Sequence, residues 1–196
     1  GDLFEPIGPL TREEAVKAFT EQMEGLKAGG VDVLWIETMS AEIEMQAAAE
    51  AAEAIGLPYA ITGSFDTAGK TMMGLRPKAM HAVLDTQPCG HDHHAAVGAN
   101  CGVGASDLLA AILEMTAEDK NDTLIVAKAN CGIPQVKGDS VVYTGTPELM
   151  SEYVHLAINS GAHIIGGCCG TSPIHLKAMR DAIDAHDEMG ERPSLE

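Results

Sequence analysis

Apolar residues recur at helical spacing near the start of the chain. A capping box, Thr11-Arg12-Glu13-Glu14, is followed by apolar positions at intervals of four, four and three residues, namely Ala15, Phe19, Met23 and Leu26. This spacing predicts a helix that begins after Thr11 and ends near Gly29.

A different pattern, continuous and apolar, comes next. Residues 31–36 read Val-Asp-Val-Leu-Trp-Ile, a run that is too short for a helix and rich in β-forming residues. It predicts a buried parallel strand that ends in Glu37-Thr38. The segment from Ser40 to Gly56 is rich in alanine and glutamate and predicts the following helix.

The same strand and helix unit recurs over the rest of the chain. Further strands are predicted at 59–62, 95–99, 123–127 and 163–167, and further helices at 77–84, at 106–115 and after Thr146-Pro147 and Ser172-Pro173, where an N-cap precedes a proline. Together these patterns give five strands and six helices. Their alternation predicts an α/β fold with parallel strands and helices packed outside them.

Two α/β architectures fit this order of elements. An open doubly wound sheet is complete with five strands, whereas a (β/α)8 TIM barrel averages about 250 residues. At 196 residues the chain corresponds to about six barrel units, so the barrel interpretation requires that the first strands are missing. Both architectures place active residues at the carboxyl ends of the strands, and the pattern alone leaves both open.

The charge and the apolar runs of the chain exclude some classes of partner and location. The chain has 12 Lys and Arg against 29 Asp and Glu, a formal net charge of -17, and this acidity disfavours nucleic acid as a partner. Its apolar runs are too short for a membrane span, and the opening Gly1-Asp2-Leu3 has no signal-like pattern, so we expect a cytoplasmic protein without membrane contact. Because the sequence begins without Met, we expect the natural protein to be longer.

Three of the five cysteines follow predicted strands. Cys101 comes after the strand at 95–99, and Cys168-Cys169 come after the strand at 163–167, so parallel strands bring all three to one rim. Three thiolates with a fourth position open are typical of a catalytic zinc site. Small buried residues under loops, or a thiol redox site, are the alternatives.

The charge of such a site favours one kind of chemistry. Three thiolates and Zn²⁺ carry a net charge of -1, which makes the metal a poor activator of water. A substrate thiol bound to the same ion loses its proton yet stays nucleophilic. The predicted reaction is therefore transfer of an alkyl group to sulfur.

These residues resemble a known family. Gly166-Gly167-Cys168-Cys169-Gly170-Thr171, with Gly98-Ala99-Asn100-Cys101 upstream, is similar to the zinc motifs of the homocysteine S-methyltransferase family. The resemblance extends over nearly the whole chain, through Gly1-Asp2-Leu3, Gly8-Pro9-Leu10-Thr11, Ile36-Glu37-Thr38, Ser64-Phe65-Asp66-Thr67 and Ala129-Asn130-Cys131-Gly132-Ile133-Pro134.

The resemblance implies a fold and a site. It implies one homocysteine-binding (β/α)8 barrel domain over residues 1–196, N-terminally incomplete, with strands four to eight of the barrel present. It also implies that Cys101, Cys168 and Cys169 hold Zn²⁺, that homocysteine sulfur is the fourth ligand, that Glu37 receives the homocysteine ammonium and that Asn100 supports the metal rim. Asp66, at the fifth barrel strand, is a candidate either to orient the substrate or to cap the following turn.

The implied activity is zinc-dependent methyl transfer to homocysteine, giving methionine. The donor stays open among betaine, S-methylmethionine and methylcobalamin. Betaine users carry an aromatic residue directly after the glutamate, where this chain has Thr38. A partner chain or domain swapping is a candidate to complete the barrel, and a homo-oligomer or a corrinoid or other partner domain is a candidate assembly. A non-catalytic zinc-binding fragment or interaction module is the alternative function.

Other features receive structural interpretations. The segment Cys89-Gly90-His91-Asp92-His93-His94 contains enough potential ligands for a second ion, although a solvated loop is favoured. Cys131 is expected to be a small buried side chain rather than a metal ligand. Core positions are expected for Trp35 and for four methionines, Met72, Met73, Met150 and Met179.

Overall fold

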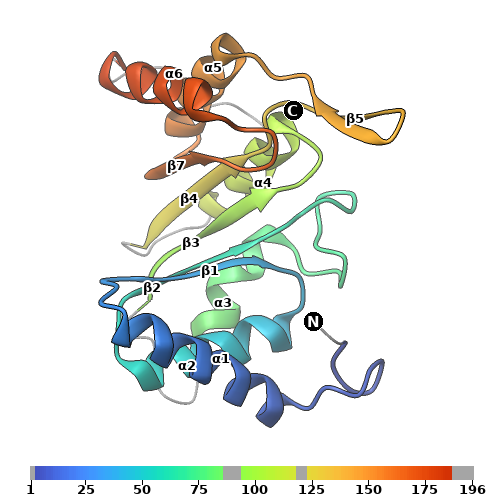
Figure 1. The fold of residues 1–196 in the computed structure, drawn as a ribbon, viewed down its shortest axis with the longest axis vertical. Coiled ribbons are helices and arrows are strands. Elements are labelled where there is room, and N and C mark those ends of the chain that lie inside the picture. The colour runs from blue at the N-terminus through green and yellow to red at the C-terminus, as the bar shows by residue number, and fades with distance from the viewer. Residues whose placement is uncertain (1–2, 86–93, 118–122, 187–196) are drawn as a thin grey trace.

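The computed structural model describes residues 3–85, 94–117 and 123–186, and its centre is a parallel five-stranded sheet (Figure 1). The strands lie side by side in chain order, β1-β2-β3-β4-β7. Their bounds are β1 Leu34–Met39, β2 Tyr59–Gly63, β3 His94–Cys101, β4 Leu124–Ala129 and β7 Ile164–Gly167. The prediction of an α/β fold with parallel strands is confirmed.

Helices separate the strands along the chain. They are α1 Arg12–Ala28, α2 Glu42–Ile55, a short 3-10 turn η1 Pro77–Ala79, α3 Met80–Asp85, α4 Ala105–Thr116, α5 Pro147–Asn159 and α6 Pro173–Asp184. Figure 1 shows α1 and α2 beside β1 at one end of the sheet, and α5 and α6 beside β7 at the other. Among the residues described, no helix is both long and apolar enough to cross a membrane.

The main hydrophobic core lies between the helices and one face of the sheet. Every second strand residue enters this core, including Ile36, Ile61, Val97 and Ile125, together with side chains from all the longer helices. A much smaller cluster covers the other face, made of Ala60, Ala96 and Val126 with Ile164 against them. A doubly wound sheet would carry helices on both faces. The one-sided packing and the sequential strand order therefore favour the barrel architecture.

The starts of β1 and α2 lie later in the chain than predicted. The first strand begins at Leu34 rather than at Val31, and helix α2 begins at Glu42, with Ala41 as its N-cap. Ser40 lies outside the helix, and its backbone N–H donates to Glu44 Oε2 at 3.0 Å. The acidic side chain of the first turn thus satisfies a backbone donor that precedes the helix.

A two-stranded antiparallel hairpin was not predicted from the sequence. It consists of β5 Pro134–Lys137 and β6 Ser140–Tyr143 and follows the carboxyl end of β4. Gly138, with φ of 62°, lies in the tight turn between the two strands. The hairpin carries Tyr143 toward the cysteines of the candidate site described below.

Candidate functional site

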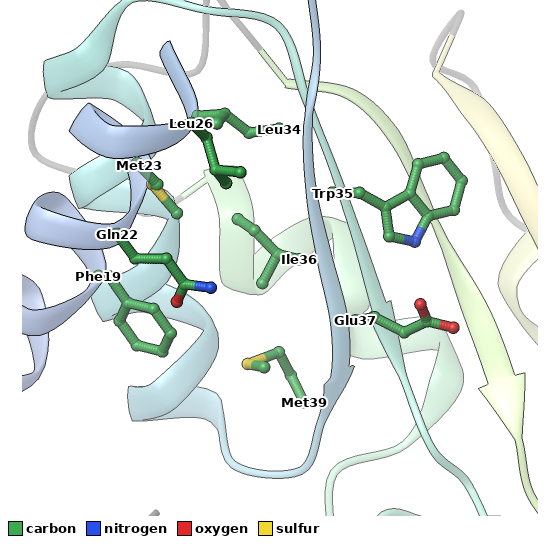
Figure 2. Close-up of a pocket in the computed structure, with 9 residues that line it drawn as sticks. All are labelled: Phe19, Gln22, Met23, Leu26, Leu34, Trp35, Ile36, Glu37 and Met39. Atoms are coloured by element: carbon green, nitrogen blue, oxygen red, sulfur yellow. The ribbon is translucent and has the colours of Figure 1, made fainter. Parts of the chain in front are cut away.

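The inward face of the sheet carries polar side chains near the carboxyl ends of its strands. Figure 2 shows Trp35 and Glu37 on the opposite side of β1 from Leu34, Ile36 and Met39, which face the helices. By the same alternation, Thr62, Asn100 and Lys128 lie on this inward face. We expected Trp35 to be a buried packing residue, but its exposed fraction is 37%.

Three sulfur atoms converge at this rim. Cys101 Sγ lies 3.7 Å from Cys169 Sγ, and Cys168 Sγ lies 3.9 Å from Cys169 Sγ. All three sulfurs lie within 4.8 Å of one another. Zinc–sulfur bonds of about 2.3 Å in a tetrahedron separate the sulfurs by about 3.8 Å, so the donor set fits a zinc ion that leaves one position open.

Backbone turns after β3 and β7 aim these sulfurs. Cys101 adopts a left-handed conformation with φ of 63°, and Gly102 follows with φ of 75°. The Cys168 N–H donates to Ala129 O at 2.8 Å, which fixes the start of the second cysteine turn against β4. A left-handed non-glycine residue is strained, and such strain is concentrated at functional sites.

The crowding of the sulfurs opposes ionisation. Burial, the neighbouring Cys168 sulfur and a hydrogen bond with Cys169 together raise the pKa of Cys101 to about 12. A divalent cation at the centre of the cluster would reverse this effect, because thiolates ligate the metal and thiols do not. The three sulfurs can therefore act as thiolate ligands only when a cation replaces their protons.

Asn100 links the sulfur cluster to β1 and β2. Its Oδ1 accepts from the Thr62 hydroxyl at 2.7 Å and from the Thr38 N–H at 3.1 Å, and its Nδ2 donates to Thr38 Oγ1 at 2.7 Å. The same Nδ2 lies 4.0 Å from Cys168 Sγ. Asn100 and Thr62 are both buried, so this network is shielded from water.

Asn130, which we did not identify as a site residue from the sequence, connects the two cysteine turns. Its Nδ2 donates to Gly102 O at 2.7 Å, and its Oδ1 accepts from the Cys169 N–H at 3.1 Å. The side chain is buried and lies at the end of β4, between the strands that carry the cysteines. Asn130 therefore holds the two cysteine turns together without being a metal ligand.

Glu37 is not one of the groups clustered with the cysteines but pairs with Lys128, which no sequence motif marks. Lys128 Nζ donates to Glu37 Oε1 at 2.6 Å, and it also lies 5.3 Å from the centre of the Trp35 ring. These three residues line a cavity of about 420 Å³ together with residues of β7. The predicted ammonium receptor thus already has one cationic partner.

Tyr143 lies over the second cysteine turn from the hairpin. Its ring packs against Gly170, whose φ is 79°, and a side chain at this position would overlap the ring. A hydrogen bond with Cys169 raises the pKa of the Tyr143 hydroxyl. The hairpin therefore adds a polar group to the rim beside the sulfurs.

The remaining candidates lie apart from the sulfur cluster. Asp66 is exposed and accepts a hydrogen bond from the adjacent Thr67 hydroxyl at 3.2 Å. Cys131 is buried in the main core and is not one of the clustered sulfurs, as we expected. The Cys89–His93 part of the proposed second ion site lies outside the described residues, and the side chain of His94 is likewise not described.

The methionines divide into two groups. Met150 and Met179 are buried in the core, as predicted, but Met72 and Met73 are exposed by 72% and 44%, so the core prediction was wrong for these two. They line a cavity of about 350 Å³ beside Thr38. Phe4, Glu5 and Glu44 also line this cavity.

A groove runs along β1, on the helix-facing side. It has a volume of about 280 Å³ and is lined by residues of α1 and β1, namely Phe19, Gln22, Met23, Leu26, Leu34, Trp35, Ile36, Glu37 and Met39, of which Trp35 and Glu37 point their side chains to the opposite side of β1 (Figure 2). In this sheet β1 is an edge strand, with β2 as its one strand neighbour.

A parallel sheet in barrel order that gathers three thiols on its carboxyl rim defines an α/β protein with a candidate metal centre. The chain belongs to the homocysteine S-methyltransferase family, whose family model matches residues 2–183. The family resemblance seen in the sequence motifs is therefore confirmed.

Two solved structures share the fold. The homocysteine methyltransferase MmuM from Escherichia coli, in its apo form, is similar with a TM-score of 0.64 and 23% identity, over 85% of this chain and 57% of that one. A type I 3-dehydroquinate dehydratase from Clostridium difficile matches with a TM-score of 0.50 and 12% identity, over 90% and 61% of the two chains. At these identities the similarity concerns the fold, and the chain spans less than two thirds of either structure.

Proposed function

We propose that this protein transfers a methyl group to the thiol of homocysteine and so forms methionine. The observation that carries the proposal is the convergence of Cys101, Cys168 and Cys169 within 4.8 Å at the carboxyl rim. Membership of the family supports the reaction class. The free thiols of the site favour a reducing compartment such as the cytoplasm.

The three cysteine sulfurs would hold Zn²⁺ and leave its fourth position to the homocysteine sulfur. Bound zinc would lower the pKa of the substrate thiol, so that a nucleophilic thiolate is present near neutral pH. The sulfur then forms a bond to the methyl carbon as the bond from that carbon to the donor breaks, and the donor leaves with the bonding electrons.

Residues of β1 and β3 would position the substrate. Glu37 accepts the homocysteine ammonium, because a carboxylate in a half-buried cavity forms strong charge-assisted hydrogen bonds. Asn100 keeps the end of β1 and the Cys168 sulfur in fixed relation. Asp66, which follows β2 and is exposed, would either orient the outer part of the substrate or cap the following turn, and its hydrogen bond from the Thr67 hydroxyl supports the second role.

The cavity beside Thr38 favours a cationic donor. Phe4, Glu5 and Glu44 line it together with Met72 and Met73, and Glu44 Oε2 also accepts from the Ser40 N–H at 3.0 Å. Aromatic faces and carboxylates both attract an onium group. Betaine and S-methylmethionine are therefore the donors to test first.

The test is an assay for labelled methionine from homocysteine and methyl-labelled betaine or S-methylmethionine. We expect product with the zinc-loaded protein and loss of product in Cys168→Ala. Cys131→Ala is the matched control, because the Cys131 side chain is buried and its sulfur is not one of the clustered sulfurs, while its backbone hydrogen bond to Cys169 O is kept in the variant. It should retain both zinc and turnover.

A second candidate is a zinc-binding module without turnover, and the groove along β1 favours it. A sheet edge flanked by an open groove suits a chain that completes its barrel with another segment or copy. One zinc per chain with no labelled methionine from any donor would support this alternative. Absence of tightly bound zinc would contradict both candidates.

A further inference from the structure

The ion pair between Lys128 and Glu37 crosses the inward face of the sheet. Lys128 is on β4 and Glu37 is on β1, and β2 and β3 lie between these strands. The two side chains nevertheless meet at 2.6 Å, with exposed fractions of 21% and 34%. Such a contact between strands that are not neighbours requires that both side chains extend across the same concave surface.

Lys128 lies close to the strand ends that carry the clustered cysteines. Lys128 is in register with Asn100 on one side and with Gly166 on the other, and these residues precede Cys101 by one position and Cys168 by two. The Lys128 stem passes over Gly166, where a Cβ atom would lie only 3.2 Å from Lys128 Cγ. The absence of a side chain at Gly166 therefore leaves the path open for the lysine.

The charges of the pair are only partly used within the protein. Lys128 engages Oε1 of Glu37, which leaves Oε2 as a second acceptor, and an ammonium group has three N–H donors. The cavity of about 420 Å³ beside the pair is large enough for a small substrate. A ligand with one cationic and one anionic group on adjacent atoms could contact both members without separating them.

We infer that Lys128 and Glu37 together recognise the zwitterionic head group of an α-amino acid. Glu37 accepts hydrogen bonds from the ammonium, and Lys128 donates to the carboxylate, so that charges of opposite sign alternate around the head group. The thiol end of the amino acid then extends toward the sulfur cluster one level above. This inference rests on the proposed function and adds Lys128 as the residue that selects substrates with a carboxylate.

A narrower role for Lys128 would be to orient Glu37 alone. The two roles differ in what they predict for ligands that lack one charge. If Lys128 binds the carboxylate, its loss weakens the binding of every ligand that carries a carboxylate, with or without an ammonium. If Lys128 only orients Glu37, its loss weakens the binding of every ligand that carries an ammonium. Truncated thiols therefore separate the two roles.

The experiment measures dissociation constants by calorimetry with the zinc-loaded full chain. The probes are homocysteine, 3-mercaptopropylamine, which lacks the carboxylate, and 4-mercaptobutanoate, which lacks the ammonium. For Lys128→Met we expect homocysteine and 4-mercaptobutanoate to bind about 10- to 100-fold more weakly, because each loses a charge-assisted hydrogen bond. The affinity for 3-mercaptopropylamine should not fall.

Matched variants guard against effects on folding. Lys128→Arg keeps the charge and should keep most of the preference for homocysteine over 3-mercaptopropylamine. The double variant Glu37→Gln with Lys128→Met removes both charges at nearly constant volume and should lose discrimination among the three probes. Lys137→Met, at an exposed lysine on β5, is the control that should change none of these affinities.

Equal weakening of homocysteine and 3-mercaptopropylamine by Lys128→Met would overturn the inference, as would failure of the unaltered protein to bind homocysteine. The proposed function is judged separately by the labelled-methionine assay. Charge-dependent binding without methyl transfer would leave the head-group site standing and reject the reaction. Methyl transfer combined with unchanged selectivity among the probes in Lys128→Met would support the reaction and reject the head-group site.

Discussion

Asn100 holds Thr38 through two hydrogen bonds, one to its backbone N–H at 3.1 Å and one to its hydroxyl at 2.7 Å. Thr38 has a left-handed backbone with φ of 68°, which is strained for a β-branched residue. The asparagine of β3 therefore fixes the conformation in which β1 ends, directly after Glu37. This relationship couples the sulfur cluster to the proposed head-group site.

Asn100→Ala should destabilise the protein. The substitution removes the acceptor shared by the Thr62 hydroxyl and the Thr38 N–H, which keep only their 3.5 Å contact with each other, and we expect the free energy of unfolding to fall by about 2 kcal/mol. Urea denaturation measures the change. In a Thr38→Gly background the left-handed conformation is no longer strained, so Asn100→Ala should cost less there. An equal loss in both backgrounds would show that the clamp on Thr38 has no energetic role.

The repeating strand and helix unit could be predicted from the sequence, because each unit contributes its own run of apolar residues to the main core. The strands at 59–62 and 123–127 are continuous apolar runs that lie within the observed strands apart from one terminal residue, and the helix from Arg12 begins at its capping box. Strand order and one-sided helix packing depend on contacts between distant segments. Local patterns do not contain that information, and for this reason the choice between the two architectures stayed open.

Two features missed from the sequence had local signals. The tetrapeptide Ala-Asn-Cys-Gly occurs at 99–102 and again at 129–132, so the repeated motif marks Asn130, although in the sheet Asn100 is in register with Lys128 and Asn130 follows the end of β4. Gly138-Asp139 between two valine-containing segments is a typical hairpin turn. The Lys128–Glu37 pair had no such signal, because 91 positions separate its members and only the curvature of the sheet joins them.

Asn130→Ala should weaken zinc binding without removing a ligand. The side chain ties Gly102 O to the Cys169 N–H, so its loss frees both cysteine turns. Residues that orient metal ligands typically contribute 10- to 100-fold in affinity, and we expect a loss of about that size in competition with a chelator. Asn159→Ala, the same change at the end of α5, should leave the affinity unchanged. An unaltered affinity in Asn130→Ala would mean that the backbone alone positions the sulfurs.

Zinc affinity should increase with pH. The raised pKa of Cys101, about 12, means that its thiol stays protonated through the neutral range, and zinc must displace that proton. Raising the pH lowers the proton concentration and so reduces this competition, which strengthens binding. Chelator competition between about pH 6 and pH 9, corrected for protonation of the chelator, measures the slope. Cys101→Ser should show a shallower slope, and a pH-independent affinity would contradict zinc ligation by these thiols.

Two glycine substitutions should change stability in opposite directions. Gly25 lies inside α1 with open space around its missing Cβ, so Gly25→Ala should raise the free energy of unfolding by about 0.5–1 kcal/mol.

Gly170 has φ of 79°, and a Cβ there would overlap the Tyr143 ring. Gly170→Ala should therefore cost about 1–3 kcal/mol and also weaken zinc binding, since the strained turn carries Cys169. Denaturation and chelator competition on both variants test this pair. If Gly170→Ala lost stability but kept full zinc affinity, the turn would be needed for packing of the hairpin and not for aiming the sulfur.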